Sequence, residues 1–98
     1  MLYQKTEYVK EPRLWMTPEE ILPHVEEAKR RKDAIAAALA DTAVAKRVVL
    51  SLKTEEGMRV SEALAEQMEA LRERLFHAEE ACLTAQEEYE DSLWFFGR

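Results

Sequence analysis

Apolar residues recur at alternating steps of four and three along the second half of the chain, and nine of ten such positions are apolar. This spacing of 3.5 residues predicts a helix that packs lengthwise against another helix, as in a coiled coil. Charged residues fill the positions between, which predicts a solvated outer surface. The ten positions are Leu64, Met68, Leu71, Leu75, Ala78, Cys82, Ala85, Tyr89, Ser92 and Phe96.

A second helix is predicted upstream, and Thr17-Pro18-Glu19-Glu20 marks its start. A hydroxyl at the N-cap with glutamate three residues later is a capping box, and proline suits the first helical position. Its predicted inner stripe is Ile21, Val25, Ala28, Ile35, Leu39, Ala43 and Leu50, interrupted by Lys32 and Lys46.

These signals predict an all-α protein with one long antiparallel hairpin in residues 17–98, preceded by an extended arm over residues 1–16. The first helix is predicted at about 18–54, the turn at about 55–60 and the second helix at about 61–95. Gly57 is expected to take the left-handed conformation that ends a helix, and Ser61 to cap the next one.

The alanine-rich stretch 34–52 is apolar on more than one side, which a single partner helix cannot cover. We therefore expect a homodimer in which two hairpins form a four-helix bundle. The expected self-association residues are Ala37, Val44, Val48 and Leu52.

The folded-back chain would bring most aromatic residues to one end, next to four acidic residues. This end can be an aromatic plug that seals the hairpin, or a surface that binds a partner protein, and the two are compatible. The predicted partner-binding residues are Trp15, Tyr89, Trp94, Phe95, Phe96, Glu87, Glu88, Glu90 and Asp91.

Composition narrows the functional classes. The chain has 98 residues and a net charge of −6, so we expect no direct binding to nucleic acid or to a membrane. The only cysteine, Cys82, is expected to be a core residue rather than a reactive thiol. No signal peptide or membrane-spanning run is visible, which predicts a soluble cytoplasmic protein.

The inventory of chemical groups predicts no catalytic residue, no cofactor and no metal. His24 and His77 would lie about 20 Å apart in the hairpin, too far to share an ion. We therefore expect a non-enzymatic assembly or adaptor protein. The alternative is a small acidic inhibitor that mimics nucleic acid and binds a nucleic-acid-binding protein. A third class, a bundle that holds a small ligand or metal, would need a polar pocket in its core.

Overall fold

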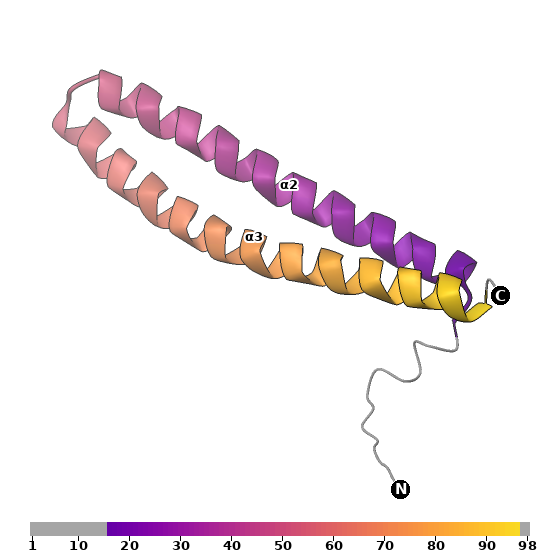
Figure 1. Cartoon of the computed structure of the whole chain (residues 1–98). Helices are drawn as coiled ribbons and strands as arrows, with labels where there is room; N and C mark the ends of the chain where they lie inside the picture. Colours follow the sequence, from indigo (N-terminus) through magenta and orange to yellow (C-terminus); the bar gives the residue numbers. More distant parts are fainter. Residues whose placement is uncertain (1–15, 97–98) are drawn as a thin grey trace, which may run out of the picture. The chain divides into compact units, whose positions relative to one another are not determined.

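Two long helices packed as a hairpin make up the computed structural model, which describes residues 16–96 (Figure 1). Helix α2 spans Pro18–Ser51 and α3 spans Glu55–Phe96. No strand occurs within residues 16–96. The predicted all-α hairpin is confirmed. The predicted arm, apart from Met16, lies outside the described residues.

The start of α2 is the predicted capping box. The Thr17 backbone N–H donates to Glu20 Oε1 at 2.9 Å, and the Glu20 N–H is 3.3 Å from Thr17 Oγ1. The Glu20 carboxylate thereby satisfies the Thr17 N–H, and the Thr17 hydroxyl shares the Glu20 N–H with the Thr17 backbone oxygen, which lies 3.0 Å from the Glu20 nitrogen. Ile21, at the fourth helical position, is fully buried. The chain therefore enters α2 in a fixed conformation.

The predicted turn at 55–60 is wrong, because the chain reverses at residues 52–54. The residue with positive φ is Lys53, at 55°, and not Gly57. Thr54, rather than Ser61, caps α3, since its hydroxyl accepts the Gly57 N–H at 2.9 Å. The first helix therefore ends three residues earlier, and the second begins six residues earlier, than predicted.

Gly57 lies inside α3 because the two helices approach closely at this point. A Cβ atom at Gly57 would lie 2.6 Å from the backbone oxygen of Val49 and 2.9 Å from Thr54 Oγ1. Gly57 and Ser61 are both buried, and they extend the four-and-three spacing of α3 back to its first turn. Small side chains at the inner positions therefore let the helices meet near the turn.

The hairpin comprises two compact units, which are described separately. In the unit of residues 30–80, Ile35, Leu71 and Ala78 form the buried core, with Leu39 and Leu75 packed against it. The other unit combines the start of α2, up to Lys29, with residues from Ala81 onward. Its buried side chains are Ile21, Cys82, Ala85 and Ser92.

The predicted inner positions of α3 are buried or partly buried from Leu64 to Ser92. Phe96 departs from the prediction, since it is 42% exposed at the end of the helix. On α2, Leu50 is also exposed and Val49 lies further inward, because the strict alternation from Ile35 through Lys46 leads to position 49. Lys32 and Lys46 are half-buried, which fits long stems lying along the apolar surface.

Candidate interaction surface

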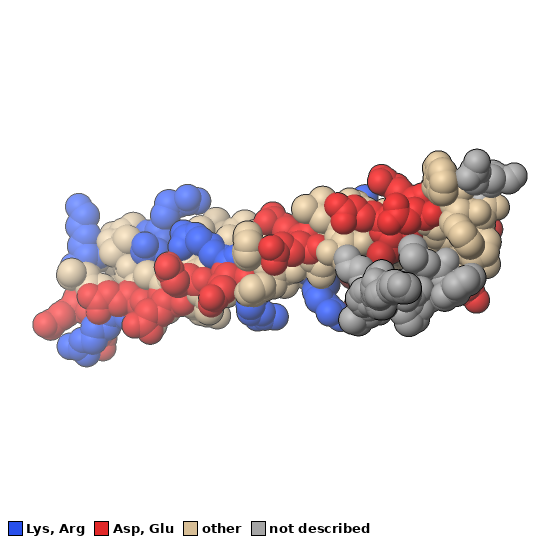
Figure 2. All heavy atoms as spheres, turned by 60° about the horizontal axis from the view of Figure 1, so that its bottom comes forward, with Lys and Arg blue, Asp and Glu red and all other residues tan. Residues whose placement is uncertain are grey.

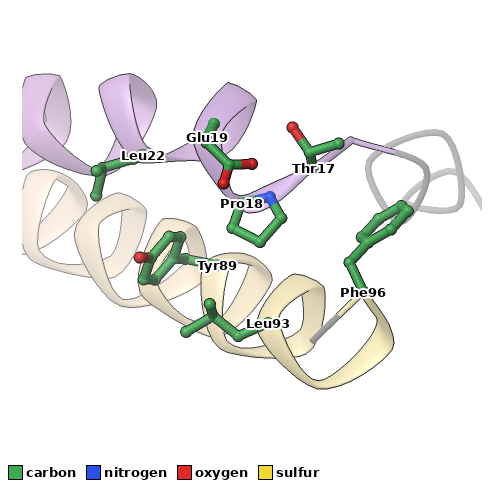
Figure 3. Close-up of a pocket in the computed structure, with 7 residues that line it drawn as sticks. All are labelled: Thr17, Pro18, Glu19, Leu22, Tyr89, Leu93 and Phe96. Atoms are coloured by element: carbon green, nitrogen blue, oxygen red, sulfur yellow. The ribbon is translucent and has the colours of Figure 1, made fainter. Parts of the chain in front are cut away.

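An open hollow of about 460 Å³ lies between the start of α2 and the end of α3 (Figure 3). Pro18 and Leu22 of α2 contribute apolar surface on one side, and Tyr89, Leu93 and Phe96 of α3 do so on the other. Thr17 and Glu19 complete the lining and add polar atoms. A hollow of this composition suits an apolar side chain with a polar or basic neighbour.

A partly buried hydrogen bond holds the two sides of this hollow together. Ser92, only 1% exposed, donates its hydroxyl proton to the backbone oxygen of Met16 at 2.8 Å. The small side chain of Ser92 brings the chain just before α2 against α3, and the capping box then fixes the direction of α2. The hollow is therefore built on two anchored helix ends, which suits a preformed binding surface.

Four consecutive apolar residues close α3, and all of them are substantially exposed. Leu93, Trp94, Phe95 and Phe96 are 44%, 67%, 50% and 42% exposed. Successive residues on a helix point about 100° apart, so four in a row cannot share one buried face. The rings of Phe95 and Phe96 pack edge to face, with centroids 4.9 Å apart. An exposed cluster of this size is typical of an interaction surface.

Acidic side chains dominate the described part of this unit, residues 16–29 and 81–96. It contains eight Asp and Glu residues and one lysine, for a net charge of −7. Glu87, Glu90 and Asp91 are exposed, whereas Glu88 is half-buried. Acidic side chains gather beside the uncharged surface at this end of the molecule (Figure 2). This end therefore combines exposed apolar side chains with neighbouring acidic ones.

The structure brings together only some of the predicted binding residues. Tyr89 and Phe96 line the hollow, whereas Trp94 and Phe95 lie on the same last turns without lining it. Trp15 lies outside the described residues. Sequence reasoning did not select Thr17, Pro18, Glu19, Leu22 and Leu93 for the site. The capping box in the sequence fixes where α2 starts. It was therefore the signal that could have identified the first turn of α2 as one side of the hollow.

Three of the predicted self-association residues lie on the outside of α2, and the fourth, Leu52, lies in the turn that follows it. Val44, Val48 and Leu52 are 49%, 56% and 61% exposed, and Ala37 is exposed as well. No described residue covers this face. These positions form a second apolar surface, within the unit of residues 30–80.

The described residues offer little else for chemistry. Within residues 16–96, no three His, Cys, Asp or Glu side chains are placed to hold a metal ion together. Cys82 is a free thiol with 3% exposure. His77 Nδ1 lies 3.8 Å from Glu80 Oε1 on an exposed surface. Neither α2 nor α3 is sufficiently long and apolar to span a lipid bilayer.

Comparison with known proteins gives no relative from which a function could be transferred. No protein-family model matches the chain, and neither curated proteins nor solved structures give a significant match. Function is therefore inferred from the residues of this chain alone.

Proposed function

We propose that the protein is a non-enzymatic interaction module whose end surface binds a basic segment of another protein. The end surface consists of the residues that line the hollow together with Trp94, Phe95 and the neighbouring acids Glu87, Glu90 and Asp91. The observation that carries the proposal is the exposed run Leu93–Phe96 beside described segments, residues 16–29 and 81–96, whose net charge is −7.

Burial of apolar surface supplies the affinity in this proposal. Tryptophan and phenylalanine bury large areas at little conformational cost, and such residues dominate the binding energy of many interfaces. Trp94 is 67% exposed, so a partner can still bury most of its surface. One apolar side chain of the partner occupies the hollow between Leu22 and Tyr89, both of which line it.

The charge of the unit determines the kind of partner. Lysine and arginine beside the partner's apolar anchor meet Glu19 in the lining and the exposed acids of α3. Complementary charges speed association and select against acidic competitors more than they add affinity. The expected partner segment therefore carries one or two large apolar residues flanked by basic ones, and the expected compartment is the cytoplasm.

Peptide selection on the immobilised full chain tests the proposal. We expect a random peptide library to yield sequences with an aromatic or aliphatic anchor next to Lys or Arg. Their affinity should fall about tenfold or more in Leu93→Ser and in Trp94→Ala, since loss of a central anchor costs that much. Leu83→Ser is the matched control, because Leu83 is a similarly exposed leucine of α3 that does not line the hollow.

Selection of no such peptides would contradict the proposal, and so would an equal loss of affinity in the Leu83→Ser control. Circular dichroism of each variant shows whether the helices are retained. A variant that loses its helical signal is replaced by the milder Leu93→Ala, for which the same loss of affinity is expected.

A second function, mimicry of nucleic acid toward a nucleic-acid-binding protein, is favoured by the net charge of −7 of residues 16–29 and 81–96. A mimic acts through charge, so its binding weakens steeply with salt and does not depend on Trp94. Competition with duplex DNA for a basic DNA-binding protein distinguishes the two. If the chain displaces the DNA at low salt and the Trp94→Ala variant does so equally well, mimicry is supported. If the chain still binds its protein partner at about 0.5 M salt and this binding requires Trp94, the interaction module is supported.

A further inference from the structure

The unit of residues 30–80 exposes more large apolar side chains than it buries. Its core of buried residues is Ile35, Leu71 and Ala78. Seven large apolar side chains are between 44% and 61% exposed in the same unit: Val44, Val48, Leu50, Leu52, Met58, Val60 and Phe76. Leu39 and Leu75 pack against this core and are partly buried. Isolated exposed apolar residues are ordinary, but seven in one unit leave apolar surface that contact with another molecule can bury.

The exposed residues of α2 share one side of the helix. At about 100° per residue, Ala37, Val44 and Val48 fall within about 40° of one another. Ile35 points to the opposite side, toward the core. Alanine at position 37 leaves room for a close approach of another helix. Ala37, Val44 and Val48 form the outer face of α2, and Leu52 follows directly after the helix. The exposed Asp41 lies on the same side, between Ala37 and Val44, so the apolar part of this face is concentrated from Val44 to Leu52.

The charges of the unit indicate what covers that face. Residues 30–51 of α2 carry five basic and two acidic side chains, whereas residues 55–80 of α3 carry eight acidic and three basic ones. Lys and Arg side chains lie beside Asp and Glu side chains along the molecule in Figure 2, so the two signs of charge are close neighbours on its surface. A unit with one basic and one acidic helix is complementary to itself. A second copy can place its acidic α3 beside the basic α2 of the first.

We propose that a second copy of this chain covers the outer face of α2, with α3 of each copy beside α2 of the other. A twofold arrangement of this kind covers the outer face of α2 in both copies. It also places the acidic α3 of each copy beside the basic α2 of the other. The proposal goes beyond the function proposed above and is independent of it, because it concerns residues 30–80 rather than the end surface.

Sedimentation of the full chain at micromolar concentrations tests the proposal. The expected mass is twice the 11.4 kDa of one chain. Val48→Glu should shift the mass to that of one chain, because it places a charge on the outer face of α2. Leu83→Glu should leave the dimer intact, since Leu83 is 60% exposed, comparable to the 56% of Val48, but lies on α3 outside this unit.

Thermal unfolding over a wide range of protein concentrations gives a second readout, in case the dissociated variant loses its helices. The midpoint for the unmodified chain should rise with concentration, and that for Val48→Glu should not. A chain that sediments as a monomer, folded or unfolded, overturns the proposal. A dimer that survives Val48→Glu, or that Leu83→Glu disrupts equally, also overturns it.

Discussion

Replacing Gly57 with alanine should destabilise the protein, although alanine is the better helix former. Gly57 lies in the first turn of α3, where the exchange would otherwise stabilise the helix by up to about 1 kcal/mol. The added Cβ, however, would lie 2.6 Å from the Val49 backbone oxygen and 2.9 Å from Thr54 Oγ1. Both distances are below 3.0 Å, which real Cβ contacts essentially never show, so the surroundings must move.

The cost can be estimated from the two contacts. A backbone oxygen cannot rotate away, so the ends of α2 and α3 must separate, and overpacking of this kind costs about 1–3 kcal/mol. If the Thr54 side chain turns away, α3 loses the hydrogen bond from the Gly57 N–H, which is worth about 1 kcal/mol. After the gain in helix propensity is subtracted, the free energy of unfolding should fall by about 1–3 kcal/mol.

Urea denaturation followed by circular dichroism measures this change. All variants are compared at one protein concentration, since self-association would shift the midpoint. In thermal unfolding, each kcal/mol lost should lower the midpoint by about 4–8 °C. Glu56→Ala is the control, because Glu56 is exposed and neighbouring, and its replacement should change stability by no more than about 0.5 kcal/mol. A Gly57→Ala protein as stable as the unmodified chain would refute the close approach at Gly57.

Three further substitutions probe the turn, the end of the hairpin and the core. Lys53→Gly should raise the free energy of unfolding by up to about 1 kcal/mol in urea denaturation, because Lys53 has a φ of 55° that glycine adopts without strain. Ser92→Ala should cost about 1 kcal/mol, since the Met16 carbonyl loses its donor, and hydrogen exchange at the start of α2 should quicken. Leu71→Ala should cost about 2–5 kcal/mol by the same denaturation assay, whereas Phe76→Ala, at a 55% exposed position, should cost far less.

The inner face of α3 was predictable because helix packing imposes its own period on the sequence. Every predicted position from Leu64 to Ser92 is at least partly buried. The start of α2 was predictable for a similar reason, since the capping box is a local pattern whose hydrogen bonds join residues three apart. In both cases the signal depends on near neighbours in the sequence.

The turn was not predictable in the same way, because glycine and serine each have two common structural roles, at helix ends and at close helix contacts. Gly57 was interpreted as a helix end, which requires a left-handed φ, but it is a position of close helix contact. Lysine at position 53 gave no sign of its positive φ. Extending the four-and-three spacing back from Leu64, with small residues allowed, reaches Ser61 and Gly57. That extension would have placed both residues on the face of α3 that packs against α2.

The misplaced turn also affected the candidate site, because the turn sets which residues of an antiparallel hairpin face each other. A reversal at Glu56–Gly57 would place Ser92 across from position 22, whereas its hydroxyl bonds to Met16. Exposure along Leu93–Phe96 was predictable from helix geometry alone, since four consecutive apolar residues cannot all face inward. The first turn of α2 forms the other side of the hollow. This could not be predicted, because it depends on which residues of α2 and α3 face each other, and local patterns do not define that register.

Hydrogen–deuterium exchange of the full chain with a selected basic peptide tests the central claim most directly. The claim predicts slower exchange on peptide binding at residues 17–22 and 89–96, the two helix ends that line the hollow. The effect should be absent with a peptide in which the apolar anchor is replaced by serine. Protection confined to residues 44–52, or none at either helix end, would contradict the assignment of partner binding to the end surface.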